Sequence, residues 1–171
     1  MNKPILYCDL DQTIANFNKL RDSLGLIPDP KGESTKVPKG FFEELELIDG
    51  AKEAIEKLSE HYNIYFLSTP QWSNPNSYSE KRVWIEKHFG EFAFKRLTLT
   101  HQKYLSIGDY LIDDRNSHGN EKFQGELIHF GSEKFPDWKS VLTYLMPKEN
   151  TARNLAMKVG DHFREIGVYQ T

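Results

Sequence analysis

Short strand-like runs alternate with stretches of helical periodicity along most of this chain. The strand-like runs cover residues 4–10, 63–70, 94–100, 109–114 and 125–131. The helical stretches cover residues 49–62, 77–90 and 137–146, and in the second we expect Val83, Trp84 and Phe89 to face inward. Strands that alternate with helices are typical of parallel sheets. The pattern therefore predicts an α/β fold with a Rossmann-like parallel sheet flanked by helices on both faces.

Residues 17–48 interrupt this alternation. Their middle part, residues 24–40, carries three prolines and three glycines between two helix-like stretches. Such a segment predicts a small helical cap inserted after the first strand. We therefore expect a core formed by residues 1–16 and 49–146. Residues 147–171 predict a weakly amphipathic helical tail, to which we assign no chemistry.

Composition and charge narrow the class of protein. A chain of 171 residues with 38% hydrophobic residues is long enough for an ordered core, and a formal net charge of −3 argues against a binder of nucleic-acid polymers. The single cysteine, Cys8, favours a reducing compartment. No apolar run approaches the roughly 20 residues that span a membrane, and the first strand leaves no room for a signal peptide. We expect a cytoplasmic protein without a membrane partner, and a homodimer is left open.

Polar residues with metal-binding and phosphate-binding chemistry follow three of the predicted strands. These residues are Asp9 and Asp11, Ser68 and Thr69, and Asp113 and Asp114. Each pair alone is compatible with an ordinary turn, strand end or helix cap, but a parallel sheet brings all three pairs to one edge. Four carboxylates at one edge repel one another unless a cation binds. Oxygen ligands select a hard cation such as Mg²⁺.

The same set of residue types can perform phosphoryl chemistry. A divalent cation and a lysine such as Lys81 or Lys103 neutralise phosphoryl oxygens, while hydroxyl groups donate hydrogen bonds to them. A carboxylate beside the phosphorus can attack it in line. Asp9 and Asp11 stand at positions i and i+2 of an extended segment and point to the same side. The second acid can therefore reach the leaving oxygen beside the first.

The order of these motifs resembles that of the haloacid dehalogenase (HAD) superfamily. The motifs are DLDQT (9–13), FLSTP (66–70), a lysine, and LIDDR (111–115). Further blocks, such as GFFEELELIDGAKEAIEKL, SEKRVWIEKHFG and LTLTHQK, narrow the resemblance to the 5'(3')-deoxyribonucleotidase family. The similarity covers residues 4–146, which is nearly everything except the tail.

The resemblance implies a magnesium-dependent phosphatase that hydrolyses deoxyribonucleoside monophosphates through an aspartyl phosphate. It implies that Asp9 is the nucleophile and that Asp11 is the general acid and then the general base. The implied magnesium ligands are Asp9, the main-chain carbonyl of Asp11 and Asp114, with Asp113 close by. The implied phosphate-binding residues are Ser68, Thr69, Lys81 and Lys103, and the implied nucleoside-binding aromatics are Phe17, Phe41 and Phe42.

Three departures from the family pattern remove no catalytic group. Gln12 stands where relatives usually have glycine, which tests whether that turn needs a left-handed conformation. Ser68 and Thr69 reverse the usual order, and Asn16 replaces a frequent acid. Two alternatives remain: a HAD phosphatase for another small phosphate ester, and a phospho-acceptor signalling domain, whose acidic motifs come in a different order. The preferred base and the choice between 5' and 3' esters stay open.

Overall fold

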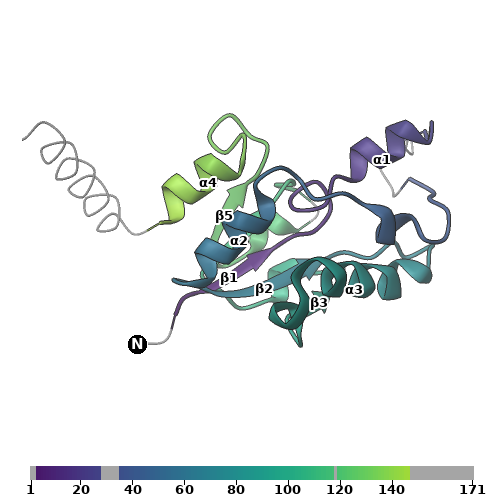
Figure 1. Ribbon diagram of the computed structural model, residues 1–171. Coiled ribbons are helices and arrows are strands. Elements are labelled where there is room, and N and C mark those ends of the chain that lie inside the picture. The colour runs from purple at the N-terminus through teal and green to yellow at the C-terminus, as the bar shows by residue number, and fades with distance from the viewer. Residues whose placement is uncertain (1–2, 28–34, 118, 147–171) are drawn as a thin grey trace, which may run out of the picture.

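The computed structural model describes residues 3–27, 35–117 and 119–146. Its strands are β1 (Ile5–Cys8), β2 (Asn63–Ser68), β3 (Leu97–Leu99), β4 (Tyr110–Asp113) and β5 (Glu126–His129). They form one five-stranded parallel sheet with the order β3-β2-β1-β4-β5 (Figure 1). The predicted α/β fold with a parallel sheet is confirmed, and each strand is shorter than the run that predicted it.

The central strand, β1, fixes where the carboxyl ends of the strands meet. Its last residue, Cys8, is in register with Phe66 of β2 and with Ile112 of β4. Asp9 and Asp113, the next residues after Cys8 and Ile112, therefore reach the same edge of the sheet. The chain leaves β1 toward β2 on one side and later returns to pair β4 on the other. This reversal of strand order is where α/β sheets usually bind ligands.

Helices and turns of the described residues connect the strands. The α-helices are α1 (Phe17–Ser23), α2 (Ala51–Ser59), α3 (Asn76–Phe89) and α4 (Trp138–Leu145). The 3-10 turns are η1 (Phe41–Glu44), η2 (Gly90–Ala93), η3 (Lys103–Leu105) and η4 (Asn120–Lys122). At the start of α4, Asp137 and Ser140 exchange side-chain and backbone hydrogen bonds in a capping box. The three predicted core helices are all present.

The helix α3 buries a single face against the rest of the protein. Trp84 and Phe89 are buried as predicted, whereas the Val83 side chain is 39% exposed. The prediction for Val83 was wrong because successive helical residues lie about 100° apart, so that position 83 falls outside the face that carries Lys81, Trp84 and Ile85.

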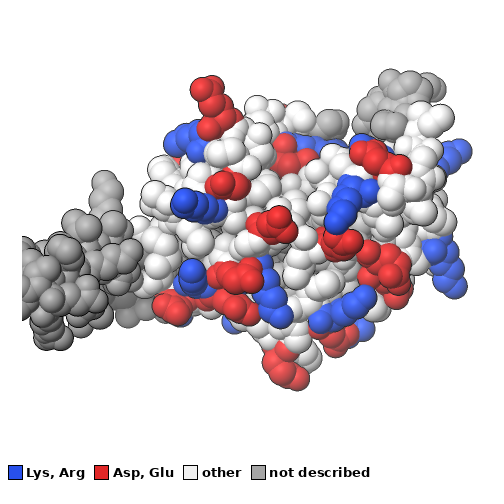
Figure 2. Space-filling model, turned by 45° about the horizontal axis from the view of Figure 1, so that its top comes forward, with Lys and Arg blue, Asp and Glu red and all other residues white. Residues whose placement is uncertain are grey.

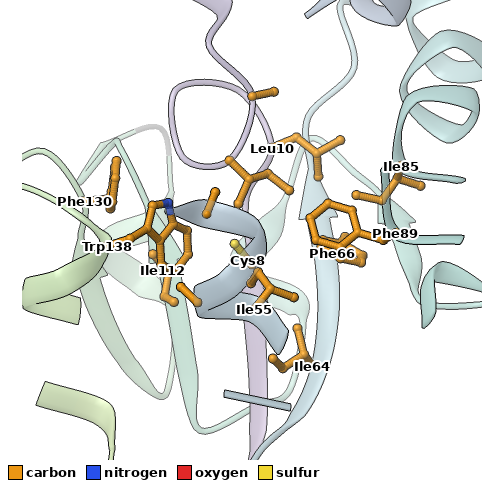
Figure 3. Close-up of a cluster of buried hydrophobic side chains, with 14 of the residues drawn as sticks. Cys8, Leu10, Ile55, Ile64, Phe66, Ile85, Phe89, Ile112, Phe130 and Trp138 are labelled. Atoms are coloured by element: carbon orange, nitrogen blue, oxygen red, sulfur yellow. The ribbon is translucent and has the colours of Figure 1, made fainter. Parts of the chain in front are cut away.

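Residues of β1, β2, β4 and β5 enter two apolar clusters, one on each face of the sheet. In β1, Leu6 and Cys8 belong to the larger cluster, while Tyr7 packs against the smaller one. The larger cluster also contains the inward side chains of α2, α3 and α4 (Figure 3). The smaller cluster includes Leu111 and Phe123. The inward side chains of α2, α3 and α4 all enter the larger cluster, so among the described residues the α-helices cover one face of the sheet and not both faces, which corrects the prediction. Phe123, which follows the turn η4, packs on the second face instead.

Residues 17–48 contribute α1 and η1, which lie toward one end of the molecule (Figure 1). Residues 28–34 of this segment and the predicted tail, 147–171, lie outside the described residues. A separate cap domain therefore stays a prediction.

None of the helices in the described part of the chain has both the length and the apolar character that a membrane crossing requires.

Candidate active site

Lys103 lies between two carboxylates at the carboxyl edge of the sheet. The turn η3 carries it there, and its Nζ donates to Oδ1 of Asp9 and to Oδ2 of Asp113, each at 2.6 Å. All three side chains are buried. Burial alone would lower the pKa of Lys103, but the charges of Asp9 and Asp113 and the hydrogen bonds to them raise it above its usual value. Lys103 is therefore a fixed positive charge at the end of β1.

Asp9, Asp113 and Asp114 form a cluster in which each offers an oxygen within 4.8 Å of the others. Asp113 also accepts hydrogen bonds on both oxygens, from Lys103 and from the backbone N–H of Arg115 at 2.9 Å. Burial and the charge of Asp9 raise the pKa of Asp113 to about 6. Burial and the charges of Asp9 and Asp113 raise the pKa of Asp114 to about 7. Three close carboxylates beside one lysine can hold a divalent cation, because such cations bind oxygen ligands.

Lys81, from α3, forms an ion pair with Asp11, the predicted general acid and base. Its Nζ donates to Oδ2 of Asp11 at 2.6 Å and to Oγ of Ser68 at 2.9 Å. The ring of Phe42 lies below this ammonium, with its centroid 4.8 Å from Nζ. The Asp11 side chain is 28% exposed. Its Oδ1 atom is enclosed and accepts no hydrogen bond from the described residues, so it can receive one from a bound ligand.

The turn between Asp11 and α1 uses a left-handed residue, as the glycine of the family pattern suggests. Gln12 has φ 58°, although it is not glycine. Its N–H donates to the carbonyl of Ala15 at 2.7 Å, and its Oε1 accepts from the N–H of Asn18 at 2.7 Å. The side chain therefore ties the first turn of α1 to the turn that follows Asp11.

The three predicted nucleoside-binding aromatics pack against one another. The ring centroid of Phe17 lies 5.0 Å from that of Phe41 and 6.1 Å from that of Phe42. Phe41 and Phe42 are almost completely buried, at 2% and 0% exposure, whereas Phe17 is half-buried. The hydroxyl-bearing Thr69 is exposed next to the buried Ser68. The fold thus assembles the predicted acids, both lysines, Ser68 and the aromatic group, and Thr69 lies at the end of β2.

Two supporting contacts were absent from the sequence analysis. The carboxylate of Glu80, only 2% exposed, accepts hydrogen bonds from the backbone N–H groups of Gly40 and Phe42. The indole N–H of Trp138 donates to the carbonyl of Thr13 at 2.9 Å and so holds the turn after Asp11. The sequence signal that could have indicated a buried Glu80 was its place directly before Lys81 on the inward face of the predicted helix.

Comparison with known proteins identifies one matching family and several relatives with similar sequences. The family described as "5' nucleotidase, deoxy (Pyrimidine), cytosolic type C protein" matches residues 35–139. A Vibrio phage KVP40 protein, named as a 5'(3')-deoxyribonucleotidase, is 44% identical over 146 residues, which cover 84% of this chain and 85% of the relative. A Staphylococcus aureus (strain Mu50) protein named for the same activity is 32% identical over 132 residues, with 71% and 72% coverage.

A solved structure supports the fold independently. The magnesium-bound HAD-hydrolase YfnB from Bacillus subtilis matches with a TM-score of 0.57 over 86% of this chain and 100% of that chain, at 10% sequence identity. At that identity the similarity concerns the fold alone. Together with the match over residues 35–139 and the 44% identity to the phage protein, it leads to one conclusion. The chain belongs to the 5'(3')-deoxyribonucleotidase family of HAD hydrolases.

Proposed function

We propose that this protein is a magnesium-dependent phosphomonoesterase that hydrolyses deoxyribonucleoside monophosphates through an aspartyl phosphate on Asp9. The observation that carries the proposal is that each of the two proposed catalytic acids pairs with a different buried lysine, Asp9 with Lys103 and Asp11 with Lys81. Both pairs lie at the edge of the sheet where α/β folds bind ligands. The names of the phage and staphylococcal relatives support the substrate class.

In this mechanism, Asp9 attacks the phosphorus of the bound ester. Lys103 holds Oδ1 of Asp9, which leaves the other carboxylate oxygen for the attack. Asp11 protonates the leaving oxygen of the nucleoside and then removes a proton from the water that hydrolyses the aspartyl phosphate. Lys81 and the hydroxyls of Ser68 and Thr69 neutralise and hydrogen-bond the phosphoryl oxygens.

The cluster of Asp9, Asp113 and Asp114 fits the proposed magnesium ion. We assign Asp9, the main-chain carbonyl of Asp11 and Asp114 as the ligands, because both oxygens of Asp113 are already hydrogen-bonded. The buried negative charge of the cluster is what a hard divalent cation would offset. When bound, magnesium neutralises charge on the phosphoryl group.

The proposed nucleoside site is the aromatic group of Phe17, Phe41 and Phe42, in which the half-buried Phe17 offers the accessible surface and the buried Phe41 and Phe42 pack behind it. An apolar wall beside the sugar would leave a 2'-hydroxyl without a hydrogen-bond partner, which costs about 1–3 kcal/mol. That cost corresponds to a roughly ten- to hundredfold preference for deoxyribonucleotides. Acidic and basic side chains are interspersed on the face in Figure 2, and such a surface suits a small substrate better than a nucleic-acid polymer. A homodimer and a cytoplasmic location stay predictions.

A phosphate-release panel tests the proposal. It compares dUMP, dTMP and dGMP with the matching ribonucleotides and with sugar phosphates, each with magnesium and with EDTA. We expect activity only with magnesium and a preference for the deoxyribonucleotides. Equal hydrolysis of ribonucleotides and deoxyribonucleotides, or a preference for a sugar phosphate, would support the alternative, a HAD phosphatase for another small ester.

A further inference from the structure

The buried face of α3 holds the aromatic segment 40–45 by hydrogen bonds to its backbone. Oε1 of Glu80 accepts from the N–H of Gly40 at 2.7 Å, and Oε2 accepts from the N–H of Phe42 at 3.3 Å. One helical turn later, the indole N–H of Trp84 donates to the carbonyl of Leu45 at 2.7 Å. Segment 40–45 is therefore fastened to α3 at both of its ends.

Glu80 performs the capping role that the start of η1 lacks. The first N–H groups of a helical turn have no partner within the turn, and a Ser, Thr, Asp or Asn at the N-cap usually satisfies one of them. The N-cap of η1 is Gly40, which has φ 86° and no side chain that could accept a hydrogen bond. Glu80 supplies the missing acceptors from a position 40 residues further along the chain.

The burial of Glu80 makes these two hydrogen bonds important. A carboxylate that is 2% exposed loses its hydration and must be stabilised by donors or a cation. The ammonium of the neighbouring Lys81 is engaged with Asp11 and Ser68 instead. The position of the Glu80 carboxylate and the position of the N–H groups of η1 therefore depend on each other.

Segment 40–45 in turn contacts the phosphate site. The ring of Phe42 lies 4.8 Å from Nζ of Lys81, and Lys81 binds both Asp11 and Ser68. Two adjacent residues of α3 thus have separate tasks: Glu80 fixes the backbone that carries the aromatic group, and Lys81 fixes the acid and hydroxyl of the phosphate site. We propose that Glu80 is a positioning residue that sets the place of the nucleoside-binding aromatics relative to the phosphate site. This inference rests on the proposed function.

Amide hydrogen exchange tests the capping part without any substrate. In Glu80→Gln, the amide group has one acceptor oxygen and faces one backbone N–H with its own N–H₂, and in Glu80→Ala both acceptors are lost. We expect exchange in segment 40–45 to accelerate on the order of tenfold in Glu80→Gln and further in Glu80→Ala. The matched control is Glu86→Gln, because Glu86 lies on the same helix, is exposed and forms a surface ion pair with Arg82. Exchange that equals that of Glu86→Gln overturns the proposal.

Steady-state kinetics test the positioning part. For Glu80→Gln we expect KM for dUMP to rise on the order of tenfold. We expect KM for 2-deoxyribose 5-phosphate, which has no base, and kcat for both substrates to change less than about threefold. An unchanged KM for dUMP, or equal losses on the two substrates, overturns the proposal. A wild-type enzyme without nucleotide activity refutes the proposed function instead, and the exchange experiment still decides whether Glu80 caps η1.

Discussion

The two lysines of the candidate site divide it into two sides with different charge balance. The side that we propose binds the metal, here called the metal side, consists of Asp9, Asp113, Asp114 and Lys103. The side that we propose binds phosphate, here called the phosphate side, consists of Asp11, Ser68, Lys81 and Phe42. On the metal side three carboxylates share one ammonium group, whereas on the phosphate side one carboxylate and one ammonium group are balanced.

This difference indicates what each side can bind. An excess of buried negative charge is unfavourable at low effective dielectric, so the metal side gains from a cation. The raised pKa values of Asp113 and Asp114, about 6 and about 7, have the same cause. On the phosphate side, Asp11 is partly exposed and its charge is already balanced by Lys81, so this side gains no comparable stabilisation from a cation.

The largest expected effect separates the two acids. Asp9→Asn should reduce phosphate release at least about 10⁴-fold and abolish the covalent phosphoenzyme, because an amide is a very poor nucleophile. Asp11→Asn should reduce turnover about 10²- to 10⁴-fold, which is the usual contribution of a general acid or base. Assays with saturating magnesium measure both. Asp49→Asn, at an exposed position, is the control, and substantial activity in Asp9→Asn would contradict the assigned nucleophile.

The next effect separates the two lysines. Lys103→Met leaves Asp9 and Asp113 buried without their cation, and we expect a loss of about 3 kcal/mol in the free energy of unfolding when divalent cations are absent. Magnesium should restore much of this loss. Lys81→Met should lose less and show little dependence on magnesium, because Asp11 retains contact with solvent.

Urea denaturation with magnesium and with EDTA measures this contrast between the lysines, and Lys52→Met, at an exposed position, serves as the control. Both lysine variants should also lose turnover, on the order of tenfold or more. The same magnesium dependence in both variants would mean that the two sides do not differ in charge balance.

A pH experiment tests the metal side directly. The pKa of Asp114 rises from 3.8 to about 7 on folding, so the folded state without metal holds a proton that the unfolded state releases. Stability should therefore fall as pH rises from about 4 to about 7, by about 3 kcal/mol for this group. The measurement is the unfolding free energy of the wild type minus that of Asp114→Asn, in EDTA. A difference that stays constant over this pH range would contradict the shift.

The smallest expected effect concerns the turn that follows the acids of both sides. Gln12 adopts a left-handed conformation that costs a non-glycine residue about 1 kcal/mol, but its side chain gains a hydrogen bond from Asn18. Gln12→Gly removes both, so we expect a change in unfolding free energy below about 1 kcal/mol. Gln12→Ala keeps the strain and loses the hydrogen bond, and thermal denaturation should find it less stable than Gln12→Gly. The opposite order would show that the turn is unstrained.

The sequence predicted the strands and helices and the convergence of the acids, because these follow from local periodicity and from one rule of parallel sheets. Asp9 and Asp113 meet because each comes at the end of a strand that pairs with its neighbour. The sequence also indicated Gln12 as the residue that would show whether the turn needs a left-handed conformation, and Gln12 adopts that conformation. In each case the information lies within a few residues of the position concerned.

Other features depend on contacts between residues that lie far apart in the sequence, and no local sequence pattern predicts such contacts. Lys81 and Lys103 were both expected near phosphate, but their separate partners are set by the positions of α3 and η3 relative to β1. The Glu80 carboxylate meets a backbone 40 residues earlier in the chain, and backbone N–H groups carry no sequence signal. The near-complete burial of Phe41 and Phe42 likewise depends on how η1 packs against α3.

The position of β1 at the centre of the sheet has a consequence for biosynthesis. Asp9 leaves the ribosome early, but the lysine that neutralises it lies 94 residues further along the chain. The strand β4, which places Asp113 and completes the pairing of β1, is made later still. A nascent chain that ends before Lys103 therefore carries the proposed nucleophile without its counter-ion and without Asp113 and Asp114. Catalytic competence should appear late in synthesis, after closure of a long-range contact rather than with the first folded turn.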